Sequence, residues 1–117
     1  MKIKIFTKTG ISALLFGCLV GWPAMADDAT QMWNSNCAAC HGKDGIGQTM
    51  MESRSNIKDL TDPKVQASFT DAQATKTIKE GYTDEYGKQK MKAFSDKFSD
   101  DDIKALVAKV RSFKPAK

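Results

Sequence analysis

Histidine and cysteine are scarce in this sequence, which has one histidine and three cysteines among 117 residues. A structural zinc site usually takes four ligands of these kinds, and residues 27–117 contain only two cysteines and the one histidine, which argues against such a site. Regular alternation of apolar and polar side chains is also missing, and without it there is no signal for a half-buried strand. The sequence therefore predicts an all-α domain that is not built around a zinc centre.

Residues 1–26 have the features of a secretory signal peptide. Three lysines precede an uncharged apolar run from Ile11 to Trp22, and Ala24–Ala26 has a small residue on each side of a methionine. This order is typical of a segment that is removed after export. We predict cleavage after Ala26, a single domain over residues 27–117, and a location in the periplasm or elsewhere outside the cytoplasm.

Two other interpretations of this segment stay open. It could remain as an anchor, although its apolar run of twelve residues is shorter than the roughly 20 residues that a membrane-spanning helix needs. Cys18 follows a glycine, so it could carry a lipid instead of being removed. The bulky Phe16, two residues earlier, argues against lipidation.

The basic charge of the chain is concentrated in this segment. The sequence has 18 basic and 14 acidic residues, and three of the lysines but none of the acids lie within residues 1–26. The rest of the chain then has 15 basic and 14 acidic residues, a net charge of +1. Such a balanced composition argues against a nucleic-acid partner. Any preference for a charged partner must come from local patches.

Four helices are predicted in residues 27–117, and the last is the clearest. Ser99 is a capping residue, three aspartates fill the first turn, where carboxylates suit the helix dipole, and Pro115 ends the helix. The apolar residues of this helix share one face: Ile103, Leu106, Val107, Val110 and Phe113.

The first predicted helix spans about residues 29–40 and places Trp33, Cys37 and Cys40 on one face. Two long stretches between the predicted helices, residues 42–61 and 82–93, show little periodicity and are predicted to be loops.

Two shorter helices are predicted in the middle of the chain. One begins at Pro63, because proline suits the first helical position after the capping residue Asp62, and it carries Val65 and Phe69. The next spans about residues 71–80 and is followed by a C-capping glycine.

The pentapeptide CAACH, Cys37–His41, is the most informative motif. C-x-x-C-H is the attachment signature for c-type haem: the two sulfurs bond to haem vinyl groups and the adjacent histidine presents a ring nitrogen to the iron. A thioredoxin-type pair would need a βαβ pattern that is absent, and a disulfide across two residues would close too short a loop to add much stability. We predict one covalently bound haem c, with its iron, attached through Cys37 and Cys40 and ligated by His41.

The chain resembles the class I c-type cytochromes, the small soluble mono-haem electron carriers. The resemblance covers residues 27–117 and rests on the ordered set CAACHG, GIG, KEG, KMKAF and DDDIKALVAKVRSF. It implies the cytochrome c fold, with three to four helices wrapped around one haem and the first and last helices crossing. Trp33 and Leu106 match positions that meet at the crossing, whereas Lys109 stands where the family often has a tyrosine.

A second axial ligand cannot be a histidine of this chain, because His41 is the only one. Methionine, lysine, another weak donor or water remain. Met91 lies fifty residues beyond His41, which is enough chain to reach the other face of a haem, and it matches the family's ligand methionine. Since cytochromes c pair histidine with methionine, we expect Met91 to ligate. Three other methionines lie too near His41 in sequence: Met32, Met50 and Met51.

The His/Met pair predicts an electron-transfer protein that shuttles single electrons between redox partners, and not an enzyme. A thioether ligand raises the reduction potential, and with both axial positions taken the iron has no ready place for a substrate. The alternative is an open-site haem protein, a peroxidase or gas-binding sensor, in which Met91 does not ligate. Five residues are candidates to line the haem: Leu60, Phe69, Ile78, Phe94 and Phe98.

Three lysines around Met91 form a candidate docking rim for a soluble or membrane-bound redox protein: Lys88, Lys90 and Lys92. Transient redox contacts are small and steered by charge. If Met91 faces inward, we expect these lysines to point outward around the haem edge. A solvated lysine-rich loop is the other interpretation, since nearby acidic residues dilute the patch. We expect the protein to be a monomer.

Overall fold

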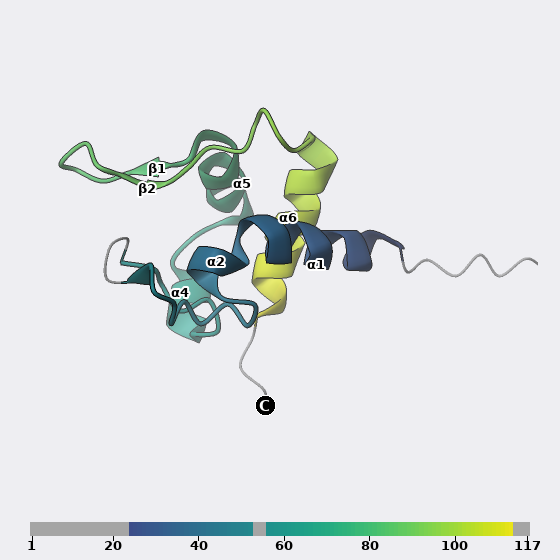
Figure 1. The fold of residues 1–117 in the computed structure, drawn as a ribbon, viewed down its shortest axis with the longest axis horizontal. Helices are drawn as coiled ribbons and strands as arrows, with labels where there is room; N and C mark the ends of the chain where they lie inside the picture. The colour runs from purple at the N-terminus through teal and green to yellow at the C-terminus, as the bar shows by residue number, and fades with distance from the viewer. Residues whose placement is uncertain (1–23, 53–55, 114–117) are drawn as a thin grey trace, which may run out of the picture.

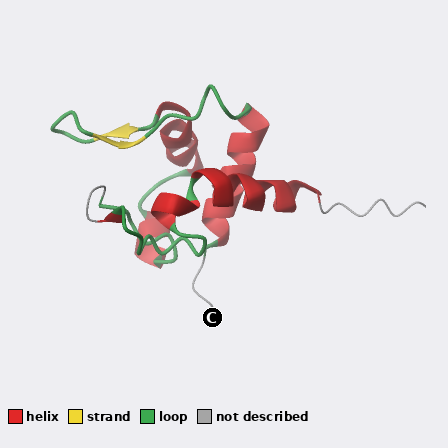
Figure 2. Ribbon diagram, viewed as in Figure 1, coloured by secondary structure: helices red, strands yellow, loops and turns green. Residues whose placement is uncertain are grey.

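The computed structural model describes residues 24–52 and 56–113 of the chain. The predicted cleavage site after Ala26 lies within these ranges, whereas residues 1–23 of the predicted signal peptide lie outside them. Helices dominate the described part, and the strands are confined to one short hairpin (Figures 1 and 2). The elements are α1 (Ala24–Asn36), α2 (Ala38–His41), α4 (Pro63–Ala67), α5 (Asp71–Glu80), β1 (Tyr82–Thr83), β2 (Gln89–Met91) and α6 (Asp100–Ser112).

The core lies where α1 crosses α6 (Figure 1). Trp33 from α1 and Leu106 from α6 belong to one buried cluster, as the sequence predicted. Lys109 lies beside this crossing with its ammonium 5.2 Å from the centroid of the Phe113 ring. That ring packs 4.9 Å from the indole of Trp33. An aromatic ring therefore does occupy the edge of the crossing, supplied by Phe113, and the lysine covers it.

The predicted bounds of α5 and the predicted start of α6 are confirmed. In α5 the Thr70 side chain accepts from the backbone of Gln73, whose side chain accepts from the backbone of Thr70. Ser99 and Asp102 form the same reciprocal box at the start of α6. Each box satisfies two backbone donors that would otherwise have no partner. The acidic first turn of α6 adds a favourable interaction with the helix dipole.

Two predicted helices differ in detail. The helix expected over residues 29–40 is interrupted at Cys37, after which α2 begins. The shared face of Trp33 and Cys37 is compatible with one continuous helix, so periodicity alone did not reveal the break. In the middle of the chain, α4 ends at Ala67, so Phe69 lies beyond the helix that was expected to carry it.

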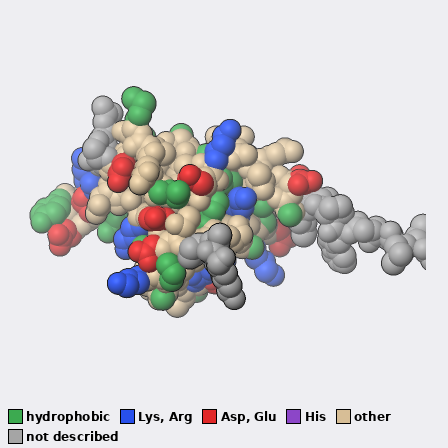
Figure 3. All heavy atoms as spheres, turned by 90° about the horizontal axis from the view of Figure 1, so that it is seen from below, with side chains coloured by type: hydrophobic (Ala, Val, Ile, Leu, Met, Phe, Trp, Pro, Cys, Tyr) green, Lys and Arg blue, Asp and Glu red, His purple; other side chains and the backbone are tan. Residues whose placement is uncertain are grey.

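The expectation of a structureless loop over residues 82–93 is wrong. β1 and β2 form an antiparallel hairpin in this segment, which extends away from the helices in Figure 2. Strands of two and three residues are too short to show the alternation on which strand prediction depends. Among the described residues, no helix is long and apolar enough to cross a membrane. Figure 3 shows acidic and basic side chains interspersed on one face, in keeping with the balanced composition.

Candidate cofactor site

His41 ends α2, and hydrogen bonds from several parts of the chain fix the backbone around it. Its N–H donates to the carbonyl oxygen of Cys37 at 2.9 Å, and its own carbonyl accepts from the N–H of Gly47 at 2.9 Å. The hydroxyl of Thr49 donates to the carbonyl of Cys40 at 2.8 Å. The loop after the motif therefore binds the last carbonyls of the short helix, which have no partners within it.

Burial and an aromatic neighbour determine the environment of the His41 imidazole. The indole N–H of Trp33 donates to the carbonyl oxygen of Gly42 at 2.9 Å, and the indole and imidazole centroids lie 5.6 Å apart. Nδ1 of His41 is buried without a hydrogen-bond partner among the described residues. Burial lowers the pKa of this histidine, because a charged imidazolium would lose its hydration. The ring is thus held neutral, the form in which histidine ligates metals.

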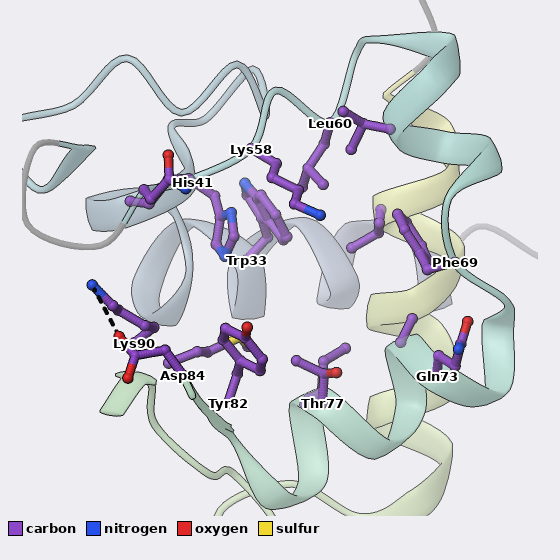
Figure 4. A pocket seen from close by; sticks show the side chains of 17 residues that line it. Trp33, His41, Lys58, Leu60, Phe69, Gln73, Thr77, Tyr82, Asp84 and Lys90 are labelled. Atoms are coloured by element: carbon purple, nitrogen blue, oxygen red, sulfur yellow. Dashed lines mark ion pairs between the residues drawn. The ribbon is translucent and has the colours of Figure 1, made fainter. Parts of the chain in front are cut away.

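A cavity of about 490 Å³ opens in front of this imidazole. Figure 4 shows His41 and Trp33 on one side and Tyr82 and Asp84 on the opposite side. Helices α1, α2 and α5, the segment around α4 and the hairpin all contribute to the wall. The lining residues are Trp33, His41, Asn56, Ile57, Lys58, Leu60, Val65, Phe69, Gln73, Ala74, Thr77, Ile78, Tyr82, Asp84, Lys90, Met91 and Val110.

A smaller cavity of about 70 Å³ contains both cysteines of the motif. Both thiols are free and half-buried. Burial, with a smaller contribution from the neighbouring Cys40, raises the pKa of Cys37 to about 11. The two cavities have four lining residues in common, His41, Ile57, Lys90 and Met91. The thiols therefore lie beside the large cavity, on the same side as the imidazole.

These residues fit a covalently attached haem. The large cavity is within the range of about 300–1,000 Å³ that is typical of cofactor pockets, and most of its lining side chains are apolar. Two thiols that are not joined to each other lie at its edge, and the His41 imidazole lines it. Lys58 also extends into the cavity (Figure 4), where a cation suits the acidic edge of a haem.

Met91 is distinguished from the other methionines by its position. It lines both cavities together with His41. Met50 is 95% exposed and Met51 is 36% exposed. Met32 packs against the core. None of these three lines either cavity, so Met91 is the one methionine, among those with described side chains, that shares the site with His41.

Four of the five predicted lining residues face a cavity. Leu60, Phe69 and Ile78 line the large one, and Phe94 lines the small one. Phe98 lines neither, and its ring stacks on that of Phe94 with centroids 5.6 Å apart. Sequence reasoning missed three polar or aromatic residues of the hairpin that also face the large cavity, Tyr82, Asp84 and Lys90.

The lysines around Met91 do not all point outward. Lys88 and Lys92 are exposed, and the ammonium of Lys92 lies 5.1 Å from the centroid of the Phe94 ring. Lys90 instead lines both cavities, and its Nζ lies 3.6 Å from Oδ2 of Asp84. The expectation that Lys90 would lie on an outer rim is therefore wrong. Only Lys88 and Lys92 remain as docking candidates.

Comparisons with known proteins identify the family of this chain. Residues 24–108 match the family described as cytochrome C oxidase, cbb3-type, subunit III. The chain belongs to this family of c-type cytochromes. Like its other members it carries covalently bound haem c with iron and takes part in haem-based electron transfer. No curated protein matches the sequence.

Solved structures of c-type cytochromes have the same fold. One is the KustC0563 c-type cytochrome, which is 30% identical with a TM-score of 0.66, over 74% of this chain and 98% of that one. A tyrosine-to-phenylalanine mutant of the same cytochrome is similar at 30% identity and a TM-score of 0.64, over 74% of this chain and 99% of that one. The predicted all-α cytochrome c fold is confirmed.

Proposed function

We propose that this cytochrome is an electron carrier in which Cys37 and Cys40 hold the haem covalently and His41 and Met91 are its axial ligands. The observation that carries the proposal is that His41 and Met91 line the same two cavities, one of which also contains both cysteines. Four potential haem-binding groups from two distant parts of the sequence thus converge on one site.

Each residue has a separate task at the proposed site. The bound haem supplies an iron that gains or loses one electron. His41 is kept neutral by burial, so its ring nitrogen is free to ligate. Met91 provides a thioether, which favours the ferrous form and raises the potential. The apolar side chains of Leu60, Phe69 and Ile78 line the cavity. They exclude water, which also raises the reduction potential.

An electron carrier is favoured over an enzyme by the same geometry. An open-site haem protein needs a free coordination position, and a methionine in the site removes it. A peroxidase is also assisted by a second, distal histidine, and the sequence has only His41. A peroxidase or gas sensor would follow only if Met91 were displaced from the iron.

Replacement of Met91 by alanine tests the ligation. We expect the haem to stay attached, the reduction potential to fall, the sulfur-to-iron charge-transfer band of the ferric protein to disappear, and exogenous imidazole to bind. The matched control is Met32→Leu, because Met32 packs against the core and lines neither cavity. An unchanged spectrum and potential in Met91→Ala would show that another group is the ligand.

We further propose that the protein is exported and acts outside the cytoplasm after cleavage following Ala26. Members of this family are typically exported, and residues 1–26 have the order of features of a signal peptide. The intact mass of the exported protein tests the cleavage site: a mass that includes residues 1–26 would contradict it.

A further inference from the structure

The hairpin that carries Met91 contains an irregularity one residue before it. Tyr82 pairs with Met91 and the adjacent Thr83 pairs with Gln89, so two neighbours on β1 face residues two apart on β2. Lys90 is therefore an extra residue in β2, a β-bulge. In a regular strand, neighbouring side chains point to opposite faces. Here Lys90 and Met91 both line the two cavities, which is the kind of re-aiming that bulges produce.

Asp84 organises the turn of this hairpin. Its Oδ1 accepts from the N–H groups of Tyr86 and Lys88, at 3.0 and 2.8 Å. Its backbone N–H donates to the carbonyl of Lys88 at 2.9 Å, and its carbonyl accepts from Gly87 at 3.0 Å. Asp84 thus forms hydrogen bonds with three of the four residues that follow it. These bonds fix the geometry of the turn, and turn geometry determines the register of the two strands.

Asp84 also reaches the bulge itself. Its Oδ2 lies 3.6 Å from Nζ of Lys90, and the two side chains are 19% and 20% exposed. An ion pair so shielded from water is stronger than one on an open surface, because solvent screens it less. The carboxylate therefore bonds to the turn with one oxygen and attracts the bulged residue with the other.

Gly81, the residue directly before β1, also constrains the strand that carries Met91. A Cβ on Gly81 would lie 2.6 Å from the carbonyl oxygen of Met91, and the backbone of Gly81 has φ +78°. The strand that carries Met91 thus packs directly against the end of α5. Little room therefore remains for this strand to move toward α5.

We propose that Asp84 is a positioning residue for the haem ligand Met91: by pairing with the bulged Lys90 and bonding the turn, it holds the thioether toward the iron. This rests on the proposed function, in which Met91 is the ligand. A purely structural role for Asp84 would change the stability of the hairpin but not the competition between Met91 and another ligand for the iron.

Imidazole, which competes with the thioether, is the probe. We compare its affinity for the ferric haem-loaded protein, by absorbance titration, in the parent, Asp84→Asn, Asp84→Ala, Lys90→Gln and Met91→Ala. Asp84→Asn keeps an oxygen for the turn but loses the charge, whereas Asp84→Ala loses both. Glu85→Gln is the matched control, because Glu85 is the next residue, is exposed and undergoes the same change in charge.

We expect Asp84→Asn and Lys90→Gln to bind imidazole about fivefold more tightly than the parent, and Asp84→Ala more tightly still, from the loss of one shielded ion pair and two hydrogen bonds to a charged group. Glu85→Gln should stay within about twofold of the parent, as an exposed charge is well screened. Equal affinities for the Asp84 variants and Glu85→Gln would overturn the role of Asp84. Equal affinities for the parent and Met91→Ala would overturn the ligation by Met91, and this proposal with it.

Discussion

The indole of Trp33 lies against the imidazole of His41, with ring centroids 5.6 Å apart and planes inclined by 39°. The same indole donates to the carbonyl oxygen of Gly42, the residue after that histidine. Trp33 therefore connects the crossing of α1 and α6 to the proposed iron ligand, since its ring also packs on Phe113 of that crossing. Packing of the core and orientation of the histidine depend on one side chain.

We expect Trp33→Phe to lower the free energy of unfolding by about 1–2 kcal/mol, because it loses the hydrogen bond to Gly42 and part of the buried ring. Trp33→Ala should cost about 3–5 kcal/mol. Guanidinium unfolding followed by haem absorbance measures both. Tyr86→Ala is the control: this aromatic ring is 86% exposed, so its removal should change stability by no more than about 0.5 kcal/mol. Equal losses in Trp33→Phe and Tyr86→Ala would contradict the prediction.

Removal of both attachment sites should prevent folding. The cavity of about 490 Å³ lies in the middle of a small domain, and without haem its apolar walls would face water or collapse. We expect the variant Cys37→Ala with Cys40→Ala to show no cooperative thermal transition by circular dichroism, because a bound cofactor stabilises only the native state. Met91→Ala, which keeps both attachment cysteines, is the control and should unfold cooperatively. A cooperative transition in the haem-free variant would refute this view.

Arg111 joins the end of α6 to Gln66 in α4 and to Phe69 in the segment between α4 and α5. Its guanidinium bonds the Gln66 side chain at 2.9 Å and the Phe69 carbonyl at 2.8 Å, and lies 4.3 Å from the Phe69 ring centroid. Its pair with Asp71, at 2.7 Å, contributes less because that carboxylate is 72% exposed. The contacts with Gln66 and Phe69 therefore account for most of the stabilisation by Arg111, and they hold a cavity-lining ring in place.

We expect Arg111→Lys to lower the free energy of unfolding by about 2 kcal/mol, since lysine keeps the charge but has no planar fork for several acceptors. Asp71→Asn should cost less than about 1 kcal/mol. Denaturant unfolding of the two variants decides between the contacts. If Asp71→Asn proved the more damaging, the ion pair and not the bonds to Gln66 and Phe69 would be the main stabilising contact. Lys104→Ala, an exposed change on the same helix, is the control.

Much of this fold could be predicted from local chemistry. The bounds of α5 and the start of α6 follow from capping residues that lie beside the helices they cap. The haem motif is equally local, since five consecutive residues carry it. The placement of Met91 and His41 at one cavity could be expected only from chain length and family resemblance, because fifty residues separate them and no local pattern indicates that they line the same site.

The hairpin is the part of the fold that could not be predicted from the sequence. Its strands are too short for periodicity, and the bulge at Lys90 breaks the alternation that remains. The carboxylate that organises the turn, Asp84, precedes a glycine by three residues, which is a common turn pattern with many other meanings. Without the register, Lys90 looked like one of three alternating lysines on a solvated loop, and its turn toward the cavity could not be foreseen.

The stability of the turn before α4 depends on pH, because its hydrogen bonds involve the carboxylate of Asp59. Oδ1 of Asp59 accepts from the hydroxyl and the backbone N–H of Thr61, at 2.6 and 2.8 Å. These bonds lower the pKa of Asp59 below its ordinary value of 3.8, because they favour the charged form. The turn is therefore fully stabilised above pH 3.8 and loses that stabilisation as the pH falls through the lowered pKa.

A carboxyl-carbon NMR titration of Asp59 measures this effect. We expect a midpoint below 3.8 in the parent and a higher midpoint in Thr61→Val, which loses the hydroxyl bond but keeps the backbone one. Thr75→Val replaces a threonine that has no hydrogen bond to Asp59, and should leave the midpoint where it is. The same midpoint in the parent and in Thr61→Val would show that the hydroxyl does not stabilise the carboxylate.

The last prediction concerns the redox partner. Lys88 lies in the hairpin and Lys92 directly after it, both exposed, on either side of the residues that line the cavity. Electron transfer is short-ranged, so we expect a partner to dock over this edge, and we propose that an acidic partner is steered there by these two lysines. Lys90 does not belong to the proposed docking surface, because its ammonium is paired with the carboxylate of Asp84.

Charge reversal at these positions tests the docking surface. We expect Lys88→Glu with Lys92→Glu to slow association with the native redox partner and to weaken its dependence on salt, because the steering charges are lost. The control makes the same change in net charge elsewhere, with Lys64→Glu and Lys104→Glu, two exposed lysines that line neither cavity. Stopped-flow electron transfer at several ionic strengths compares the two double variants. If both slow association equally, only the net charge matters, and a docking surface beside Met91 is ruled out.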